Sequence, residues 1–443
     1  MAEPYASPGW SGLAIDLLIH VVQLLELPEA LAFRAVCPLW RSASTAAAGV
    51  PRTRQTPWLV SLVTDPLPRE KQSRRAWDPS VSFKFLNVPD EKTYQVSLPQ
   101  GKGKGKAVAL CGASHGWLVL ANELSNLVLY DPFAMTTIPL PPITGFSKCI
   151  QGVYGDDDGG NLEGYRYLFY RGGDATYDVV APGMTFYDKL VLSGSPSTAA
   201  SAIALVVHTA GKQLSFARVG GAGSSSAWRL LDSMIEGAAR DSFADVIHHR
   251  GSRFYALTMK GVLVSFNFSR RNKPKRETII ARDDKDVITR YLVSAPWGHL
   301  LQIRVILHTD RKKGVRVEID RLDLIGRRMV GLSPTKALQG HTVFLGQNSP
   351  GVLSADKFPE LRPDCIYFTT PWLKNTIAYG KPYNRWRSGV KVYDLKKQTL
   401  EHSFQCRDES YERASNPQEV WFTPRQLPYK TFTASLPFLY DSH

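Results

Sequence analysis

Several common sequence features are missing from this chain of 443 residues. Its five cysteines are scattered and none forms a C-x-x-C pair, so neither a disulfide framework nor a zinc site is expected. The first residues, MAEPYASPGW, have neither the charged start nor the apolar stretch of a secretory signal. The apolar run near Leu17 is broken by polar residues and is too short to span a bilayer. These absences predict a protein of the reducing cytoplasm or nucleus that does not enter a membrane.

Motifs for catalysis and for cofactor binding are missing as well. The GKGKGK run at 101–106 lacks the spacing of a phosphate-binding loop, and no G-x-S-x-G elbow occurs. The acidic run at 156–158 is not followed by the glutamate of a calcium loop. His248 and His249 are adjacent, so in a strand they would point to opposite faces and could not bind one metal together. We therefore expect a protein that is not an enzyme and that holds neither a cofactor nor a metal.

Charge is unevenly distributed along the chain. The net charge is +14, whereas residues 1–50 carry −2, so the remainder carries +16. Two basic runs, RRNKPKR at 270–276 and RKKGVR at 311–316, are similar to nuclear-import or nucleic-acid-binding patches. Both runs fall between predicted strands, where exposed loop tips explain them equally well. Aromatic residues do not interleave with them, which weakens a stacking mode for single-stranded nucleic acid.

Apolar surface is in excess near the start of the chain. Residues recurring at three- and four-residue steps indicate a helix with an apolar face; they are Leu13, Leu17, Val21, Leu24 and Leu25. We predict three short helices, at about 14–25, 28–36 and 39–47, with Pro28 and Pro38 in the first turns of the second and third. A unit of about 40 residues cannot bury this much apolar surface alone. Another protein, or the rest of the chain, must cover it.

This helical segment resembles an F-box, the adaptor-binding module of cullin–RING ubiquitin ligases. The matching residues are Leu13, Asp16, Leu17 and Leu18 at its opening and Phe33, Arg34, Val36, Cys37, Trp40 and Arg41 at its close. Ala14 stands where the family usually has proline, and Pro38 where a basic residue is common.

The resemblance implies that the chain binds a Skp1-like adaptor and, through it, a cullin. The residues expected to support adaptor binding are Leu13, Ile15, Leu17, Leu18, Val21, Leu25, Phe33, Val36, Cys37 and Trp40. Some of them must instead form the small internal core, and the sequence alone does not divide them. The alternative is a helical cap that packs on the following domain.

Beyond the helices the hydrophobic period changes to that of β-strands. Short β-branched or aromatic runs are bounded by turn residues; they are 58–63, 116–122, 127–131, 202–208, 213–219, 253–258, 262–268, 300–307, 315–324, 364–370 and 390–395. One stretch, 229–240, favours a helix. The pattern predicts a large all-β domain.

A weak internal repeat narrows the all-β prediction to a β-propeller. Two-strand units such as GWLVLANELSNLVLYDP and GSRFYALTMKGVLVSFNF recur every 40–60 residues. The length allows six to eight blades, and we expect six. A strand near 58–63 is expected to pair with the segment VWFTP at 420–424, which would close the ring. A sandwich or a barrel is the alternative.

The segments SHGWLVL, YDPFAMTTIPLPP, HHRGSRFYAL and VYDLKKQTLE resemble plant F-box proteins whose C-terminal part is a kelch-like domain of unknown function, DUF295. The expected organisation is an F-box at 8–48, a linker at 49–57, the propeller domain at 58–424 and a tail at 425–443. The resemblance implies a substrate receptor of an SCF-type ubiquitin ligase that recruits an unknown protein for ubiquitination. The alternatives are a basic propeller that binds nucleic acid or an acidic ligand, and a propeller enzyme.

Overall fold

A computed structural model gives the structure of the protein. It describes residues 10–25, 27–47, 56–64, 81–87, 92–97, 107–132, 136–155, 160–168, 176–197, 201–221, 224–234, 241–269, 274–281, 287–307, 315–369, 390–402 and 419–423. The chain divides into two compact units, one that contains the helices near its start and one that spans Thr56–Thr423. Among the described helices, none combines the length and the apolar character needed to cross a membrane.

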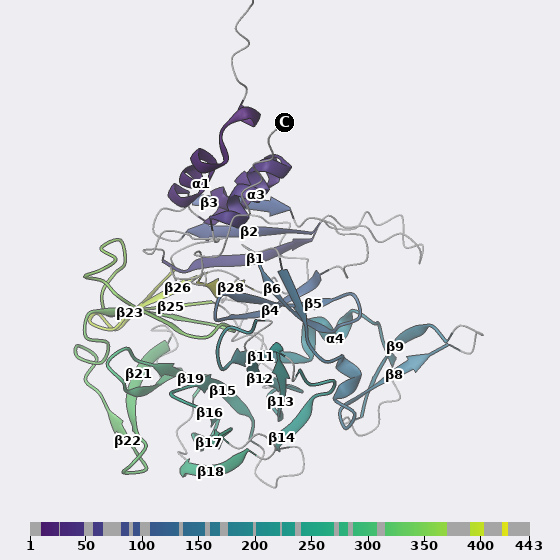
Figure 1. The fold of residues 1–443 in the computed structure, drawn as a ribbon. Helices are drawn as coiled ribbons and strands as arrows, with labels where there is room; N and C mark the ends of the chain where they lie inside the picture. The colour runs from purple at the N-terminus through teal and green to yellow at the C-terminus, as the bar shows by residue number, and fades with distance from the viewer. Residues whose placement is uncertain are drawn as a thin grey trace, which may run out of the picture. The chain divides into compact units, whose positions relative to one another are not determined.

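The first unit consists of short helices (Figure 1). A 3₁₀ turn, η1 (Trp10–Gly12), precedes α1 (Ile15–Leu24), α2 (Leu27–Val36) and α3 (Pro38–Ala46). The three predicted helices are confirmed, each to within one residue at either end, and Pro38 lies in the first turn of α3. Their shared core consists of Leu18, Val22, Ala30, Phe33, Ala43 and Ala47.

Six antiparallel or mixed sheets of four or five strands are formed by the described residues of the second unit, and we call them blades 1 to 6. Blade 1 contains β28 (Glu419–Phe422), β1 (Trp58–Thr64), β2 (Val81–Asn87) and β3 (Lys92–Ser97), and blade 2 contains β4 (Ala107–Ser114), β5 (Trp117–Asn122), β6 (Leu127–Asp131) and β7 (Thr136–Pro139). Blade 3 contains β11 (Tyr187–Leu192), β12 (Ala202–His208), β13 (Gln213–Val219) and β14 (Arg229–Ser233).

Blade 4 contains β15 (Phe243–His248), β16 (Arg253–Thr258), β17 (Leu263–Asn267) and β18 (Lys275–Ile280), and blade 5 contains β19 (Thr289–Ser294), β20 (Leu300–Leu307), β21 (Val315–Asp323) and β22 (Arg328–Gly331). Blade 6 has five strands, in the order β24 (Gly351–Ser354), β23 (His341–Leu345), β25 (Cys365–Phe368), β26 (Lys391–Asp394) and β27 (Thr399–His402). Strands β23 and β25 are parallel, and the other pairs are antiparallel.

Aromatic contacts join neighbouring blades into a closed ring. Examples are Phe83–Tyr130 between blades 1 and 2, Phe216–Phe268 between blades 3 and 4, Tyr291–Phe368 between blades 5 and 6, and Phe344–Trp421 between blades 6 and 1. Apolar clusters also fill the spaces between blades 2 and 3 and between blades 4 and 5. The sheet topology confirms the predicted six-bladed propeller, whose blades are arranged around a centre in Figure 1.

The ring closes where the two ends of the propeller meet. Strand β28 pairs with β1, so that Trp58 lies opposite Phe422 and Val60 opposite Val420. The predicted pairing of the 58–63 strand with the VWFTP segment is therefore confirmed. Because this contact joins residues from opposite ends of the domain, the propeller has a seam at β28 and β1.

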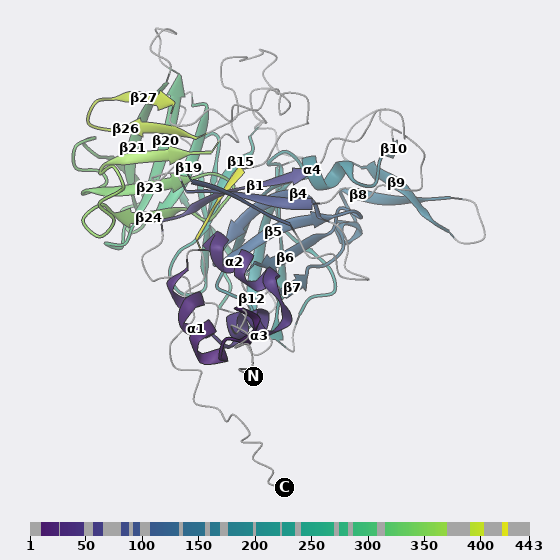
Figure 2. The ribbon, with the colours of Figure 1, turned by 90° about the horizontal axis from the view of Figure 1, so that it is seen from above.

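A three-stranded sheet lies outside this ring and projects from it (Figures 1 and 2). It contains β8 (Ile150–Tyr154), β9 (Leu162–Tyr167) and β10 (Thr176–Tyr177), in the order β10-β9-β8. It follows a 3₁₀ turn, η2 (Ile143–Gly145), and the chain returns to the ring through α4 (Ala181–Thr185). Strand β4 packs directly beside β11, so the ring is continuous without this sheet. We call it the insert.

The segment 346–349 runs along the inner strand of blade 2. Asn348 forms a parallel bridge with Ala113, and the Ser349 amide donates to the Ala113 carbonyl at 2.8 Å. The Ser114 and Ser349 hydroxyls are 2.8 Å apart. Gly346 and Gln347 line a small cavity together with inner-strand residues of blades 3, 4 and 5. The segment thus occupies the centre of the ring, where the inner strands converge.

Two local predictions are corrected by the structure. Arg229–Ser233 is strand β14, which pairs with β13, so the predicted helix at 229–240 is wrong over these residues, and 235–240 lie outside the described residues. Lys275 and Arg276 belong to β18, and Arg316 belongs to β21, so these ends of the basic runs are strand residues and not loop tips. Residues 270–273 and 311–314 of these runs, the GKGKGK run and the acidic run at 156–158 lie outside the described residues.

Candidate adaptor-binding surface

Helix α1 carries two apolar stripes that face different ways. One stripe contains Leu18 and Val22, which are buried in the core of the helical unit. The other contains Leu17, Val21 and Leu24, spaced four and three residues apart and therefore on one side of the helix. All three are exposed, Leu17 to 54%. We call Leu17, Val21 and Leu24 the outer stripe.

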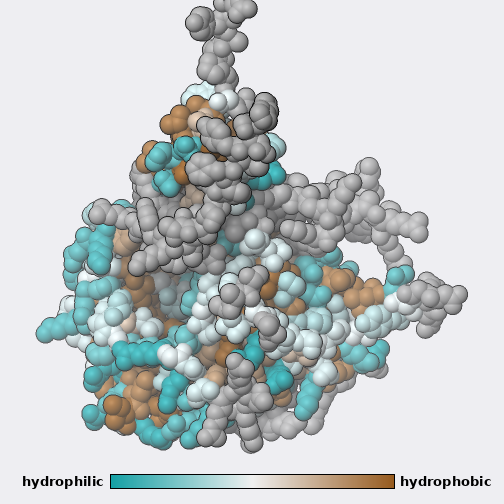
Figure 3. Space-filling model, viewed as in Figure 1, coloured by the Kyte–Doolittle hydropathy of each residue, from teal (hydrophilic) through white to brown (hydrophobic). Residues whose placement is uncertain are grey.

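A second exposed apolar group lies where α2 meets α3. Val36 ends α2 and Leu39 lies in the first turn of α3, and both side chains are exposed. In the same two helices the Phe33 and Trp40 rings pack with centroids 4.4 Å apart. Apolar side chains gather visibly on the helical unit in Figure 3. The helices therefore keep an apolar surface that their own core does not use.

The predicted adaptor-binding residues fall into three groups in the structure. Ile15, Leu17, Val21 and Val36 are exposed, whereas Leu13, Leu25, Cys37 and Trp40 are partly buried. Leu18 and Phe33 are buried in the core, so their side chains support the surface from beneath. Sequence reasoning did not assign Trp10, Leu24 and Leu39, which are exposed too. Leu24 belongs to the apolar helix face predicted from the residue spacing, but it was not assigned to adaptor binding.

The helix starts of this unit are held by backbone hydrogen bonds. Ala14 precedes α1, and its carbonyl accepts the Leu18 amide at 3.2 Å. Cys37 precedes α3, and its carbonyl accepts the Arg41 amide at 3.0 Å. Neither Ala14 nor Cys37 caps its helix with a side-chain hydrogen bond. The two departures from the F-box pattern, Ala14 and Pro38, are thus compatible with regular helix starts.

The propeller holds an ion pair inside its ring. The Lys189 ammonium lies 2.5 Å from Asp245, joining blades 3 and 4, and both side chains are buried. Asp245 also accepts the amides of Val246 at 2.8 Å and Leu292 at 2.7 Å. Burial raises the pKa of Asp245, and the Lys189 charge opposes that rise. These contacts use the carboxylate to join three blades.

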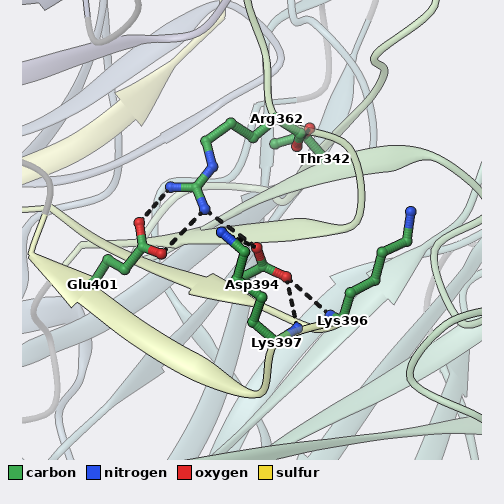
Figure 4. Close-up of polar contacts among 6 residues, drawn as sticks. All are labelled: Thr342, Arg362, Asp394, Lys396, Lys397 and Glu401. Carbon is green, nitrogen blue, oxygen red and sulfur yellow. Dashed lines mark hydrogen bonds and ion pairs between the residues drawn. The ribbon is translucent and has the colours of Figure 1, made fainter.

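On blade 6, a second group of charged side chains forms hydrogen bonds and ion pairs with one another (Figure 4). Arg362 donates to Glu401 at 2.6 Å and lies 3.3 Å from Asp394. Asp394 accepts the backbone amides of Lys396 and Lys397, each at 3.0 Å, which fixes the turn between β26 and β27. The hydrogen bond from Arg362 lowers the pKa of Glu401. These contacts hold the turn between β26 and β27 and tie it to Arg362.

Exposed arginines at the outer edges of blades 4 and 5 are paired with carboxylates. The pairs are Arg276–Asp232, Arg327–Glu277 and Arg328–Asp323. Such pairing reduces the positive field that a nucleic-acid backbone would meet.

Within the described part of the chain, no cluster of three or more His, Cys, Asp or Glu residues could hold a metal ion. The four described cysteines, Cys37, Cys111, Cys149 and Cys365, form no disulfide bond with one another.

Two known protein-family profiles match this chain. The KIB1-4 beta-propeller profile matches residues 85–394, and the F-box domain profile matches residues 10–46. The chain belongs to the KIB1-4 beta-propeller family and carries an F-box. The F-box match covers α1 to α3, and the propeller match extends from blade 1 into blade 6.

Relatives of this KIB1-4 propeller protein include F-box proteins of Arabidopsis thaliana. Putative F-box protein At4g17565 is 30% identical over 32% of this chain and 34% of its own length, and F-box protein At2g05970 is 32% identical over 32% and 34%. F-box/kelch-repeat protein At1g57790 is 26% identical over 41% and 46%. The matched stretches therefore span a third to a half of these relatives.

Solved structures show only a distant likeness to the KIB1-4 propeller protein. An alpha-L-arabinofuranosidase of Podospora anserina matches 53% of this chain and 70% of its own, with a TM-score of 0.26 and 14% identity. Apo AztD of Citrobacter koseri matches 84% and 99%, with a TM-score of 0.27 and 10% identity. Likeness at this level carries no functional information.

The burial of His208 predicts that the stability of the propeller depends on pH. It is fully buried against the Phe146 and Phe186 rings, and its two nitrogens lie 2.7 Å from the Thr209 hydroxyl and 2.9 Å from the Ser215 hydroxyl, respectively. Burial lowers its pKa to about 3. In the unfolded chain His208 takes up a proton near pH 6.5, whereas in the folded chain it stays neutral. The contribution of His208 to the free energy of unfolding is therefore complete above pH 6.5 and is lost as the pH drops toward 3. The expected slope is about 1.4 kcal/mol per pH unit.

The test compares urea unfolding of the wild type and of the His208→Gln variant between pH 4 and 8. The variant is expected to be less stable at pH 8, with the difference shrinking as the pH falls below 6.5. Parallel stability curves for the two proteins would show that His208 does not carry this dependence.

Proposed function

We propose that this protein is the substrate-receptor subunit of an SCF-type ubiquitin ligase. The outer stripe of α1 is the observation that carries the proposal, because a soluble helix that has already filled its own core has no internal use for Leu17, Val21 and Leu24. In an F-box, such a surface is expected to bind a Skp1-like adaptor, which connects it to a cullin. Val36 and Leu39 extend the proposed contact.

In this proposal the propeller recruits a protein target and makes or breaks no covalent bond. The ligase acts by proximity, because a bound target is present at high effective concentration beside the charged ubiquitin-conjugating enzyme. The propeller is proposed to belong with the DUF295 domains of plant F-box proteins, and the protein to work in the cytoplasm or nucleus. The relatives named F-box proteins support the role without naming a target.

The adaptor contact is tested with the variant Leu17→Asp/Val21→Asp. Both side chains are exposed, so the helical unit is expected to fold, whereas aspartate at Leu18 would disrupt the core. Two carboxylates on the outer stripe should weaken binding of a purified Skp1-type adaptor about 100-fold, or about 2.7 kcal/mol. Surface plasmon resonance on the full chain measures the affinity.

The control is Ile325→Asp, which places one aspartate on an exposed apolar residue of the propeller. It should bind the adaptor as the wild type does. Circular dichroism of all three proteins checks that the helices remain folded. Undiminished adaptor binding by the Leu17→Asp/Val21→Asp variant would refute the proposal.

A further inference from the structure

Blades 2 to 6 form a closed circuit of contacts that leaves out blade 1. The segment 346–349, which we call the strap, leaves blade 6 after β23 and runs along β4 of blade 2. Apolar clusters between neighbouring blades complete the circuit from blade 2 through blades 3, 4 and 5 to blade 6. Blade 1 lies between blades 6 and 2 in the ring, so the strap bypasses it.

The strap fits closely against the blades that it joins. Asn348 is 2% exposed, and its side-chain amide donates to the Ser349 carbonyl at 2.8 Å. The Ser114 hydroxyl, which lies 2.8 Å from that of Ser349, also accepts the Leu192 amide at 3.1 Å. Since Leu192 ends β11, the same hydroxyl group links the strap to blade 3.

Two glycines make this fit possible. Gly112 in β4 has a φ of +150°, and a Cβ atom there would lie 2.7 Å from the Gln347 carbonyl oxygen of the strap. A Cβ atom at Gly346 would collide with the Thr369 hydroxyl, which follows β25 in blade 6. The chain therefore leaves room for the strap on both blades that it joins.

Blade 1 is held in a different way from the other blades. It combines β28 from the end of the propeller domain with β1, β2 and β3 from its start, and β28 joins β1 through four residue pairs. Its described residues contribute Leu59 and Trp421 to the buried cluster shared with blade 6. Joining two distant chain segments costs more conformational entropy than joining neighbouring strands, so opening of the seam regains more.

Both covalent connections to the helical unit also run through blade 1. The second compact unit spans Thr56–Thr423, and Thr56 lies two residues before β1 whereas Thr423 directly follows β28. The blade that carries the helical unit is therefore the blade that the strap leaves out.

We propose that blade 1 unfolds as a separate cooperative unit while the strap holds blades 2 to 6 closed. Proteins open in cooperative units smaller than the whole fold, and the least protected units are those with the fewest supporting contacts. Unfolding of blade 1 breaks the seam but leaves the contacts of the strap with β4 intact. The opening lengthens the link between the helical unit and the other five blades. Its use in presenting a target rests on the proposed function, whereas the opening itself does not.

Hydrogen–deuterium exchange of the full chain, followed by mass spectrometry at low urea concentrations, tests the proposal. Amides of β1, β2 and β28 are expected to exchange at one common rate, about tenfold or more faster than those of β12, β16 and β20. Amides of β4 and β23, the strands next to the strap, are expected to remain with the slow group because the strap stays in place.

Two variants loosen the strap in different ways. Gly112→Ala adds a methyl group that collides with the Gln347 carbonyl, and Ser349→Ala removes the hydroxyl contact with Ser114 without changing β4. In both variants the amides of β4 and β23 are expected to exchange faster and to approach the rate of blade 1. Gly351→Ala is the matched control, because its Cβ would lie 3.7 Å from the nearest atoms; all rates should stay within about twofold of the wild type.

A single exchange rate for all six blades would overturn the proposal, because the ring would then open as one unit. Wild-type exchange of β4 and β23 in both strap variants would overturn it too, since the strap would not be what keeps the five blades closed. If Gly112→Ala does not fold, Ser349→Ala decides alone. The measurement needs neither adaptor nor target, so its failure leaves the adaptor contact standing, and loss of adaptor binding leaves the exchange result standing.

Discussion

Replacing Asp245 with alanine is expected to lower the free energy of unfolding of the propeller by about 3–5 kcal/mol. The change would leave the Lys189 ammonium buried without its partner. It would also remove the acceptor for the amides of Val246 and Leu292. Three blades lose a shared contact at once, so the effect should greatly exceed that of a surface ion pair. Urea unfolding followed by tryptophan fluorescence measures the loss.

The double variant Lys189→Met/Asp245→Leu is the informative control. It removes both charges and fills their space, so it should recover a large part of the lost stability. Asp323→Ala, which breaks an exposed ion pair with Arg328 and a hydrogen bond from the Gly326 amide, should cost much less than Asp245→Ala. If Asp245→Ala costs no more than Asp323→Ala, the buried pair does not hold the blades together.

Replacing Trp421 with alanine should cost a similar amount, about 3–5 kcal/mol, for a different reason. Trp421 lies in the closing strand β28, is 2% exposed, and packs its ring 5.0 Å from that of Phe344 in blade 6. Alanine would leave a cavity at the seam, where the ring depends on a strand from the far end of the domain. A lower urea midpoint for the propeller is the expected result.

Trp421→Phe keeps an aromatic ring at this position and should retain much of the stability. Ile325→Ala removes a side chain that is 96% exposed and should change the stability by less than about 0.5 kcal/mol. A Trp421→Ala variant that unfolds together with Ile325→Ala would mean that the seam contributes little to the stability of the ring.

The middle strands of the blades could be predicted from sequence more readily than the inner ones. Strands such as β12 and β20 are continuous apolar runs bounded by turns, and the predicted 202–208 and 300–307 runs coincide with them. The inner strands β11 and β15 were not predicted, because Lys189 and Asp245 suggest solvent-exposed positions. The Lys189 and Asp245 side chains are buried because they pair with each other, although they lie 56 residues apart in the sequence. The strand register is also irregular beside each of them, at the start of β11 and of β15. A local pattern cannot show such a pairing.

The wrong helix at 229–240 has a related cause. Leu230, Leu231 and Met234 are spaced as on a helix, but the segment pairs with β13 as the outermost strand of blade 3. Pairing with a neighbouring strand overrides the local preference. Packing between elements also decides which of the F-box residues are buried and which are exposed. Leu17 and Leu18 are adjacent in sequence, and only the packing of α2 and α3 decides that Leu18 enters the core.

The seam also sets the order in which the two units mature on the ribosome. Strand β1 ends at Thr64 and its partner β28 begins at Glu419, so about 350 residues must be translated between them. At about 5–20 residues per second this takes roughly 20–70 s. The three helices α1 to α3 have all been made once Ala47, the residue after α3, is translated. A nascent chain therefore displays the outer stripe well before its ring can close.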